Sequence, residues 1–192
     1  MAEQSTLHDI FIDELRDVYD AEKQLTKALT KLAKSASAAP LRDAFESHLE
    51  ETQGHSARLE EVFTSLDKRG SGKHCDGIAG IIQEGKSVME QDLDETTMDA
   101  ALIASGQRAE HYEMAAYGTL IAWAQAMGHD EASDLLQQTL DEEKAADKVL
   151  TSLAEGGINE KAAAIAHPDV DEEAEEPVGG GPAKRKGGSR SR

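Results

Sequence analysis

Four segments of this sequence carry an apolar stripe, and each stripe is interrupted near its middle by acidic residues or histidines. The interruptions are Glu22 in the first segment, His48 and His55 with Glu51 beside them in the second, Glu110 and Glu113 in the third, and Glu143 in the fourth. An isolated ionised carboxylate inside a helical bundle is strongly unfavourable unless it is paired or bound to a metal. Two divalent cations would balance the charge of four or more carboxylates. The coincidence across four segments therefore predicts a dinuclear metal site.

The types of side chain indicate which metal such a site would hold. Carboxylate oxygens with one or two imidazoles suit Fe(II) or Mn(II), whereas thiolate ligands favour zinc or copper(I). The single cysteine, Cys75, falls in a predicted loop away from the acidic residues, so we expect a small buried side chain and no sulfur ligand. The chain has 38 acidic residues, and any single glutamate of the set is also compatible with a surface position.

The elements that must position these side chains are predicted to be four long helices. Apolar residues recur at intervals of three and four, which is the period of an amphipathic α-helix. The stripes run from Phe11 to Leu32, from Leu41 to Leu66, from Ile103 to Ala124 and from Ala132 to Leu153. Helix-forming residues dominate the composition and runs of β-branched residues are nearly absent, which favours an all-α fold.

Residues with strong terminal preferences indicate where these helices begin and end. We expect Ser5 or Thr6 to cap the first helix and Pro40 to lie in the first turn of the second. The third helix should open near Thr96 to Asp99 and end at Gly128. Asp130 should cap the fourth helix, which should stop at Gly156 and Gly157. Short loops make the first two helices one antiparallel hairpin and the last two another. The segment GIAGIIQEGKSVME (77–90) predicts a short helix within the long connection between the hairpins. A long crossover that spans the bundle is typical of ferritin-like four-helix bundles.

Length, charge and composition set the domain organisation. The 192 residues suffice for one domain, which we place at residues 1–163. The net charge of −18 argues against a body that binds nucleic acid or an acidic membrane, and it favours cations as ligands. Residues 164–192 are acidic and then basic with almost nothing to bury, so we expect a disordered tail. The basic end could contact nucleic acid, or the tail could only increase solubility. The lack of a targeting segment or an apolar span, and the single cysteine, favour a cytoplasmic protein.

Several stretches resemble the YciE/YciF family of ferritin-like metal-binding proteins. They are DELRDVYDAEKQL (13–25), HLEETQGH (48–55), KHCDGIAGIIQEG (73–85), AEHYEMAAYGTL (109–120) and LDEEKAAD (140–147). The resemblance extends from about residue 6 to residue 163. It implies a ferritin-like bundle with a dinuclear metal site, often a homodimer, and an association with bacterial stress responses.

The resemblance also implies a ligand set, by similarity to the rubrerythrin branch of ferritin-like proteins. The implied metal ligands are Glu22, Glu51, His55, Glu110, Glu113 and Glu143. Two features depart from the usual pattern, in which a glutamate and a histidine lie three residues apart. Glu51 and His55 are four apart, so His48 with Glu51 is a rival pair. Ala146 stands where a fourth-helix histidine would follow Glu143, so Asp147 or water would have to complete the site.

These observations lead to one main functional hypothesis and one alternative. The main hypothesis is oxidation of two Fe(II) ions, with Mn possible in their place, by peroxide or oxygen in a stress response. Tyr117 lies one turn beyond Glu113 and could act at the site as a catalytic hydrogen-bond donor or radical carrier, or could only pack in the core. The alternative is a non-enzymatic, stress-induced bundle whose metal is structural or absent, and which acts through protein partners or its basic tail.

Overall fold

The computed structural model describes residues 5–166, and all the regular structure in this range is helical. The helices are α1 (Leu7–Ser35), α2 (Ala39–Ser65), α3 (Asp76–Met89), α4 (Glu95–Met127), α5 (Asp130–Leu153) and α6 (Asn159–Ala166), with a π-helical turn at Ala154–Ile158. The predictions for residues 1–4 and for the tail after residue 166 lie outside the described residues. Within residues 5–166, none of the helices combines the length and apolar character that a membrane span requires.

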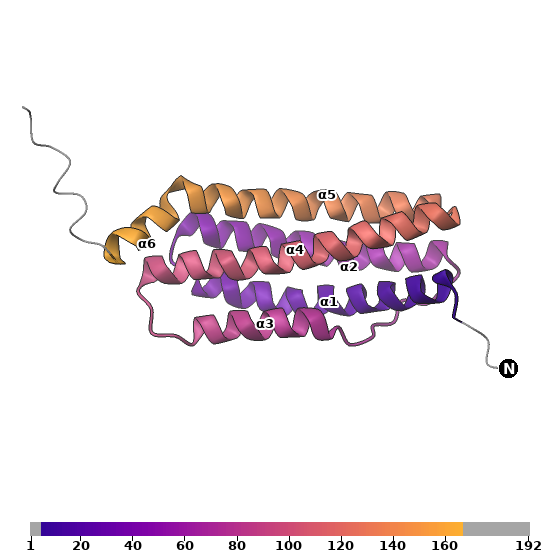
Figure 1. The fold of residues 1–192 in the computed structure, drawn as a ribbon, viewed down its shortest axis with the longest axis horizontal. Helices are drawn as coiled ribbons and strands as arrows, with labels where there is room; N and C mark the ends of the chain where they lie inside the picture. The colour runs from indigo at the N-terminus through magenta and orange to yellow at the C-terminus, as the bar shows by residue number, and fades with distance from the viewer. Residues whose placement is uncertain (1–4, 167–192) are drawn as a thin grey trace, which may run out of the picture.

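Four of the helices form the bundle (Figure 1). Helix α1 packs against α2 and α4, and α5 packs against the same two helices from the opposite corner. The connection from α2 to α4 runs the length of the bundle and carries α3, which packs against α1 and α4. This arrangement is the ferritin-like four-helix bundle with a long crossover, and it confirms the predicted fold class.

The predicted helix ends are mostly confirmed. Thr6 caps α1 in a reciprocal capping box with Asp9, and Pro40 lies in the first turn of α2. Gly128 ends α4 with a φ of 74°, a left-handed conformation that glycine adopts without strain. The prediction for Asp130 was wrong by one position. The cap of α5 is His129, and Asp130 is the first helical residue. At this position the negative charge of Asp130 interacts favourably with the positive end of the helix dipole.

The C-terminal end of α5 also differs from the prediction. The helix ends at Leu153, and the chain bends at Gly157, which has a φ of 117°, before continuing as α6. The two glycines therefore produce a kink and not a stop, because α6 has the α4 surface to pack against. At the other hairpin, the carboxylate of Asp99 on α4 accepts hydrogen bonds from the backbone N–H groups of Ser37 and Ala38, both at 2.8 Å. The α1–α2 loop is thereby tied to α4.

Two apolar clusters fill the bundle, one toward each end. The first contains Phe11, Leu15, Leu59, Phe63, Leu120 and Leu136, among others, and the second contains Leu29, Leu41, Phe45, Leu102 and Leu150, among others. Every bundle helix contributes to both clusters. The buried polar residues of the four stripes lie between them along each helix. The fold therefore presents a polar layer in the middle of an otherwise apolar core.

Candidate metal centre

The polar layer is assembled from one or more residues of each bundle helix. Glu22 comes from α1, His48 and His55 from α2, Glu110 and Glu113 from α4, and Glu143 from α5. All six are buried, and Glu22, His55 and Glu143 have no exposed surface. The heptad-like spacing of the stripes explains this, because residues three, four and seven apart share one helix face. Five of the six residues that were predicted as ligands therefore lie inside the bundle, together with the rival His48.

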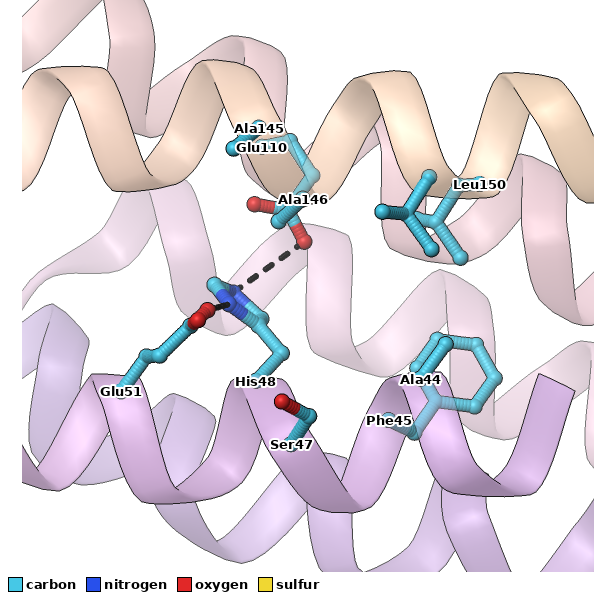
Figure 2. Close-up of a pocket in the computed structure, with 10 residues that line it drawn as sticks. Ala44, Phe45, Ser47, His48, Glu51, Glu110, Ala145, Ala146 and Leu150 are labelled. Atoms are coloured by element: carbon cyan, nitrogen blue, oxygen red, sulfur yellow. Dashed lines mark hydrogen bonds and ion pairs between the residues drawn. The ribbon is translucent and has the colours of Figure 1, made fainter. Parts of the chain in front are cut away.

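A small pocket leads from the surface to one side of this layer (Figure 2). Its volume is about 120 Å³, and it lies between α2 and α5 with Glu110 of α4 at its inner end. Ser47 and Glu51 line it on α2, and Ala145 and Ala146 line it on α5. Ala146, which occupies the position of the usual fourth-helix histidine, therefore lines an open pocket.

The ligand atoms fall into two groups that share one residue. The first group consists of His48, Glu110, Glu113 and Glu143, and the second consists of Glu22, His55 and Glu143. Within each group, every residue offers one ligand atom, and these atoms lie within 4.8 Å of one another. One Glu143 oxygen, Oε1, lies 2.9 Å from Nδ1 of His55, and the other, Oε2, lies 3.6 Å from Nε2 of His48. Each group is able to hold a metal ion, and Glu143 faces both.

Many polar atoms in the two groups lack a hydrogen-bond partner. The unpartnered atoms are Oε2 of Glu22, Nδ1 of His55, Oε2 of Glu110, Oε1 of Glu113 and both carboxylate oxygens of Glu143. The short contact between Glu143 and His55 is not aligned as a hydrogen bond. Buried polar atoms are almost always paired, and leaving one unpaired costs about 1–3 kcal/mol. Carboxylate oxygens and imidazole nitrogens are metal ligands. A concentration of such unpartnered atoms in one place is therefore compatible with the binding of cations.

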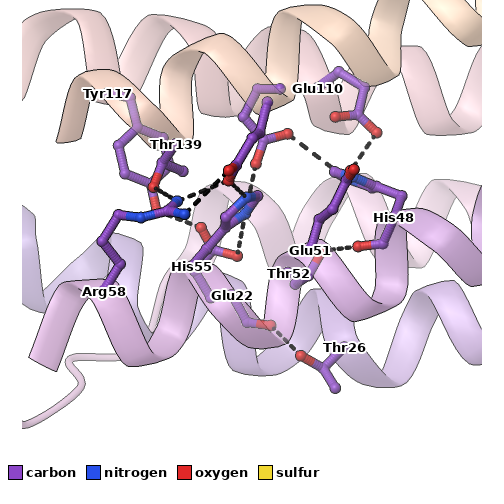
Figure 3. Close-up of polar contacts among 12 residues, drawn as sticks. Glu22, Thr26, His48, Glu51, Thr52, His55, Arg58, Glu110, Tyr117 and Thr139 are labelled. Carbon is purple, nitrogen blue, oxygen red and sulfur yellow. Dashed lines mark hydrogen bonds and ion pairs between the residues drawn. The ribbon is translucent and has the colours of Figure 1, made fainter. Parts of the chain in front are cut away.

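Each histidine turns its other nitrogen toward a partly exposed carboxylate (Figure 3). Nδ1 of His48 lies 3.3 Å from Glu51, and Nε2 of His55 lies 2.9 Å from Glu142. The carboxylates fix the rings so that one nitrogen of each faces the layer, an arrangement that is common at metal sites. Glu51 was predicted as a ligand, but its side chain is 43% exposed and lies outside both groups.

Glu142 is held in turn by Arg58, a residue that sequence reasoning did not select. The guanidinium binds both carboxylate oxygens, at 2.7 and 3.1 Å, and also donates to the hydroxyl of Thr139 at 2.7 Å. The helical pattern around Glu142 does not distinguish it from a surface glutamate. The one available signal was Arg58, which lies one turn after His55 on a helix with few basic residues.

Tyr117 and Asp147, which were both considered for the site, have different positions. The Tyr117 hydroxyl donates a short hydrogen bond to Oε1 of Glu22, and both side chains are fully buried. Asp147 points away from the layer, because its carboxylate accepts from Gln107 at 3.2 Å and contacts His111 at 3.3 Å. Among the described residues of α5, Glu143 alone belongs to the two groups.

Cys75 belongs to neither group, in agreement with the expectation that sulfur is not a ligand. It is buried at the N-terminus of α3, where its sulfur accepts from the backbone N–H of Ile78 and lies 3.1 Å from the Tyr112 hydroxyl. The donor set of the layer is therefore made of oxygen and nitrogen, without the thiolate ligands that favour copper(I) or a cysteine-bound zinc.

Burial and crowding of like charges shift the pKa values in the layer. Burial raises the pKa of Glu113 well above its usual value, and the Glu143, Glu22 and Glu110 carboxylates raise it further. Burial also raises the pKa of Glu143, to about 7, although His55 acts in the opposite direction. Burial alone would lower the pKa of His55, but the adjacent Glu143 and Glu22 carboxylates raise it to about 10. Without metal, the layer therefore retains protons near neutral pH, and cations compete with them.

Comparison with known proteins identifies the family and agrees with the helical fold. Residues 6–163 match the family described as "Domain of unknown function (DUF892)". The chain is 46% identical to Protein YciF of Escherichia coli (strain K12) over 158 residues, which are 82% of this chain and 95% of that protein. The crystal structure of the E. coli stress protein YciF has a TM-score of 0.78 at 44% identity, and the match covers 81% of this chain and 99% of that chain.

Two further solved structures are similar. YcfI from Rhodopseudomonas palustris has a TM-score of 0.76 at 44% identity, over 79% of this chain and 96% of that chain. A protein from Xanthomonas campestris has a TM-score of 0.64 at 21% identity, over 86% of this chain and 99% of that chain, and supports the fold alone. The family match covers most of the chain and the identity with YciF is high over nearly the whole of that protein. The chain therefore belongs to the YciF family, whose shared domain is DUF892.

Proposed function

We propose that this protein binds two ions of iron or manganese in the polar layer, and that it oxidises Fe(II) with hydrogen peroxide or dioxygen. The observation that carries the proposal is the position of Glu143, whose two oxygens each face a different buried histidine. A carboxylate placed in this way is suited to bridge two cations. The description of the E. coli relative as a stress protein is compatible with a peroxide-consuming role.

The two groups define the assignment of ligands. One cation would be held by His48, Glu110, Glu113 and Glu143, and the other by Glu22, His55 and Glu143. Four carboxylates then balance two divalent cations, so the net charge of the buried layer is close to zero. Glu51 is assigned a supporting role beside His48, since its carboxylate lies outside both groups.

The chain's own residues have distinct parts in this proposal. Two Fe(II) ions would supply the two electrons that, with two protons, reduce one hydrogen peroxide to two waters. Glu143 would take part in holding both cations. The Tyr117 hydroxyl donates to one oxygen of Glu22 and leaves the other oxygen, 3.6 Å from Nδ1 of His55, free to bind. The apolar clusters on both sides separate the layer from the two ends of the bundle.

One observation favours a second candidate, a non-enzymatic bundle. The His55 pKa is raised to about 10 by Glu143 and Glu22, and hydrogen bonds with Glu110 and Glu51 raise that of His48 despite its burial. Two cationic imidazoles would offset part of the buried negative charge without any metal. In that case the layer would serve structure, and the protein would act through partners. A homodimer, a cytoplasmic location and a role for the tail remain predictions.

Anaerobic titration with Fe(II) followed by peroxide tests the proposal directly. We expect about two Fe(II) per chain, and rapid oxidation when one peroxide is added for each pair of ions, because both electrons come from adjacent sites. Iron content after gel filtration and the absorbance of Fe(III) are the measurements. Binding of no iron, with an unchanged melting temperature, would favour the non-enzymatic bundle.

The Tyr117→Phe variant tests the role assigned to the Tyr117 hydroxyl. It removes one hydroxyl and keeps the ring, so the packing of the core is preserved. We expect two Fe(II) per chain and slower oxidation, because Glu22 loses the donor that orients it. An unchanged oxidation rate would assign Tyr117 to packing alone.

A further expected result concerns the support of His55. Glu142→Gln should lower the affinity of the His55 position by about 10-fold or more, since substitution of such outer partners typically weakens metal binding by about 10–100-fold. The amide cannot accept equally from His55 and Arg58, so the ring loses its fixed orientation. Isothermal titration with Mn(II) measures the change.

Glu131→Gln is a suitable control for Glu142→Gln, because Glu131 is exposed in the first turn of α5 and the change in net charge is the same. If both variants bind Mn(II) with wild-type affinity, Glu142 does not support the metal position. If both are weakened equally, the effect arises from net charge.

A further inference from the structure

The two halves of the polar layer differ in how they are covered. On the His55 side, Glu22 and His55 have no exposed surface, and the outer nitrogen of His55 is occupied by Glu142. Arg58 neutralises Glu142 with a bidentate pair and is itself only 19% exposed. This side is therefore closed by a paired, nearly neutral network.

The His48 side is open. The pocket between α2 and α5 reaches His48 and Glu110, and its volume of about 120 Å³ corresponds to roughly four water molecules. Two carboxylates line it at different depths. Glu51 lies toward the surface, where its only ion-pair partner among the described residues is His48, and Glu110 lies inside, with Oε2 unpartnered.

The order of charged groups along the pocket suits passage of a cation. A carboxylate that is not neutralised by a lysine or arginine raises the local concentration of cations. His48 lies 3.3 Å from Glu51 on one side and 3.2 Å from Glu110 on the other, so it connects the outer carboxylate to the inner group (Figure 2). Ala145 and Ala146 have no side-chain atoms beyond Cβ and leave the passage clear.

We propose that this pocket is the entrance through which divalent cations reach the metal centre, with Glu51 as the receiving carboxylate. The inference rests on the proposed function and adds the route to it. A cation with a few of its waters fits the volume. It would exchange water for the oxygens of Glu51 and then of Glu110, passing His48, before reaching Glu143. The His48 half of the centre is thus loaded from outside, and the His55 half is loaded through it.

A removable plug tests this route in the folded protein. Ser47 is exposed at the pocket, so Ser47→Cys can be modified after folding with a bulky methanethiosulfonate reagent, while the natural Cys75 is fully buried. Anaerobic Co(II) uptake is followed by stopped-flow absorbance. We expect uptake to be at least 10-fold slower when the plug is attached, to recover when a thiol removes it, and to reach the same final stoichiometry.

Ser87→Cys, modified in the same way, is the matched control, because Ser87 is exposed on α3 and does not line the pocket. It should take up Co(II) at the wild-type rate. If the plugged Ser47→Cys protein also does so, the entrance lies elsewhere and the inference is overturned, although the metal centre stands. If the unmodified wild-type protein binds no Co(II), the proposed function itself is wrong.

A pair of neighbouring glutamates tests the part assigned to Glu51. Glu51→Gln should slow Co(II) uptake several-fold and leave two ions per chain at saturation, whereas Glu50→Gln, with the same loss of charge on the exposed face of α2, should change neither. Equal rates in both variants would contradict the role of Glu51 as the receiving carboxylate. Loss of one ion per chain in Glu51→Gln would make it a direct ligand instead.

Discussion

Glu143→Gln should reduce metal binding from two ions per chain to at most one weakly held ion. The substitution keeps the size of the side chain but removes the charge and one acceptor oxygen from the residue that both ligand groups share. Each remaining group then lacks one negatively charged ligand. Because the loss acts on both positions, we expect the affinity for Mn(II) to fall by about 100-fold or more, beyond the change expected when only an outer partner is altered.

Metal content after dialysis and isothermal titration with Mn(II) are the measurements for Glu143→Gln. Asp147→Asn is the control, since Asp147 lies on the same helix, loses the same charge, and has its carboxylate turned to Gln107 and His111 outside the layer. It should bind two ions with wild-type affinity. Two tightly bound ions in Glu143→Gln would show that the two positions do not share this carboxylate.

The second large effect concerns stability, which should depend on pH in opposite ways with and without metal. In the metal-free protein, the pKa values of Glu22, Glu113 and Glu143 are raised by burial. The folded state therefore holds protons that the unfolded chain has already released above about pH 4.5. The stability contributed by protonation is present below that pH and is lost as the pH rises through the folded value, about 7 for Glu143.

His55 acts in the same direction over a higher range of pH. Its folded pKa of about 10 lies above its ordinary value, so its contribution is complete below about pH 6.5 and is lost toward pH 10. The groups with lowered pKa values, such as Asp94 at about 2, titrate below this window and do not offset the trend. We expect the melting temperature of the metal-free protein to fall by about 5 °C or more between pH 5 and pH 8.

Metal reverses this trend because cations replace the protons. Saturating Mn(II) should raise the melting temperature little at pH 5 and by about 10 °C at pH 8, since the ligands must be deprotonated to bind and ligand binding stabilises the folded state. Calorimetry with and without Mn(II) at several pH values measures both slopes. A metal-free melting temperature that does not change from pH 5 to pH 8 would contradict the buried, proton-holding layer.

The sequence predicts the bundle well because its signals are local. The three-and-four spacing of apolar residues, Pro40 at the start of α2 and Gly128 at the end of α4 each act within a turn or two of the chain. The kink at Gly157 was not predicted because it depends on a distant partner, the surface of α4 that α6 covers. A glycine pair alone does not distinguish a stop from a bend.

The membership of the polar layer is predicted less completely, for a geometric reason. At 3.6 residues per turn, His48 and His55 lie only about 20° apart around α2, whereas Glu51 lies roughly 60° from His48, at the flank of the same face. A sequence pattern cannot decide whether a residue at that flank turns inward or outward. In the structure Glu51 turns outward to support His48, and Glu142 has the same relation to His55.

The role of Glu142 could not be read from its own helix at all. It depends on Arg58 and His55, which are more than 80 positions away in the chain and meet it only when α2 packs against α5. Helix periodicity therefore locates the layer and most of its members, while the orientation of the rings is set by contacts between helices.

The two apolar clusters that enclose the polar layer have a consequence for how this fold can evolve. Each cluster contains residues from every bundle helix, so apolar packing stabilises the bundle on both sides of the polar layer. Apolar replacements for buried charged groups are often neutral or stabilising. A descendant that exchanged its six central side chains for apolar ones of similar volume could therefore keep the fold while losing the chemistry of the layer. Under the proposed function, retention of those acids and imidazoles in a lineage would reflect selection for the metal chemistry, separate from selection for the scaffold.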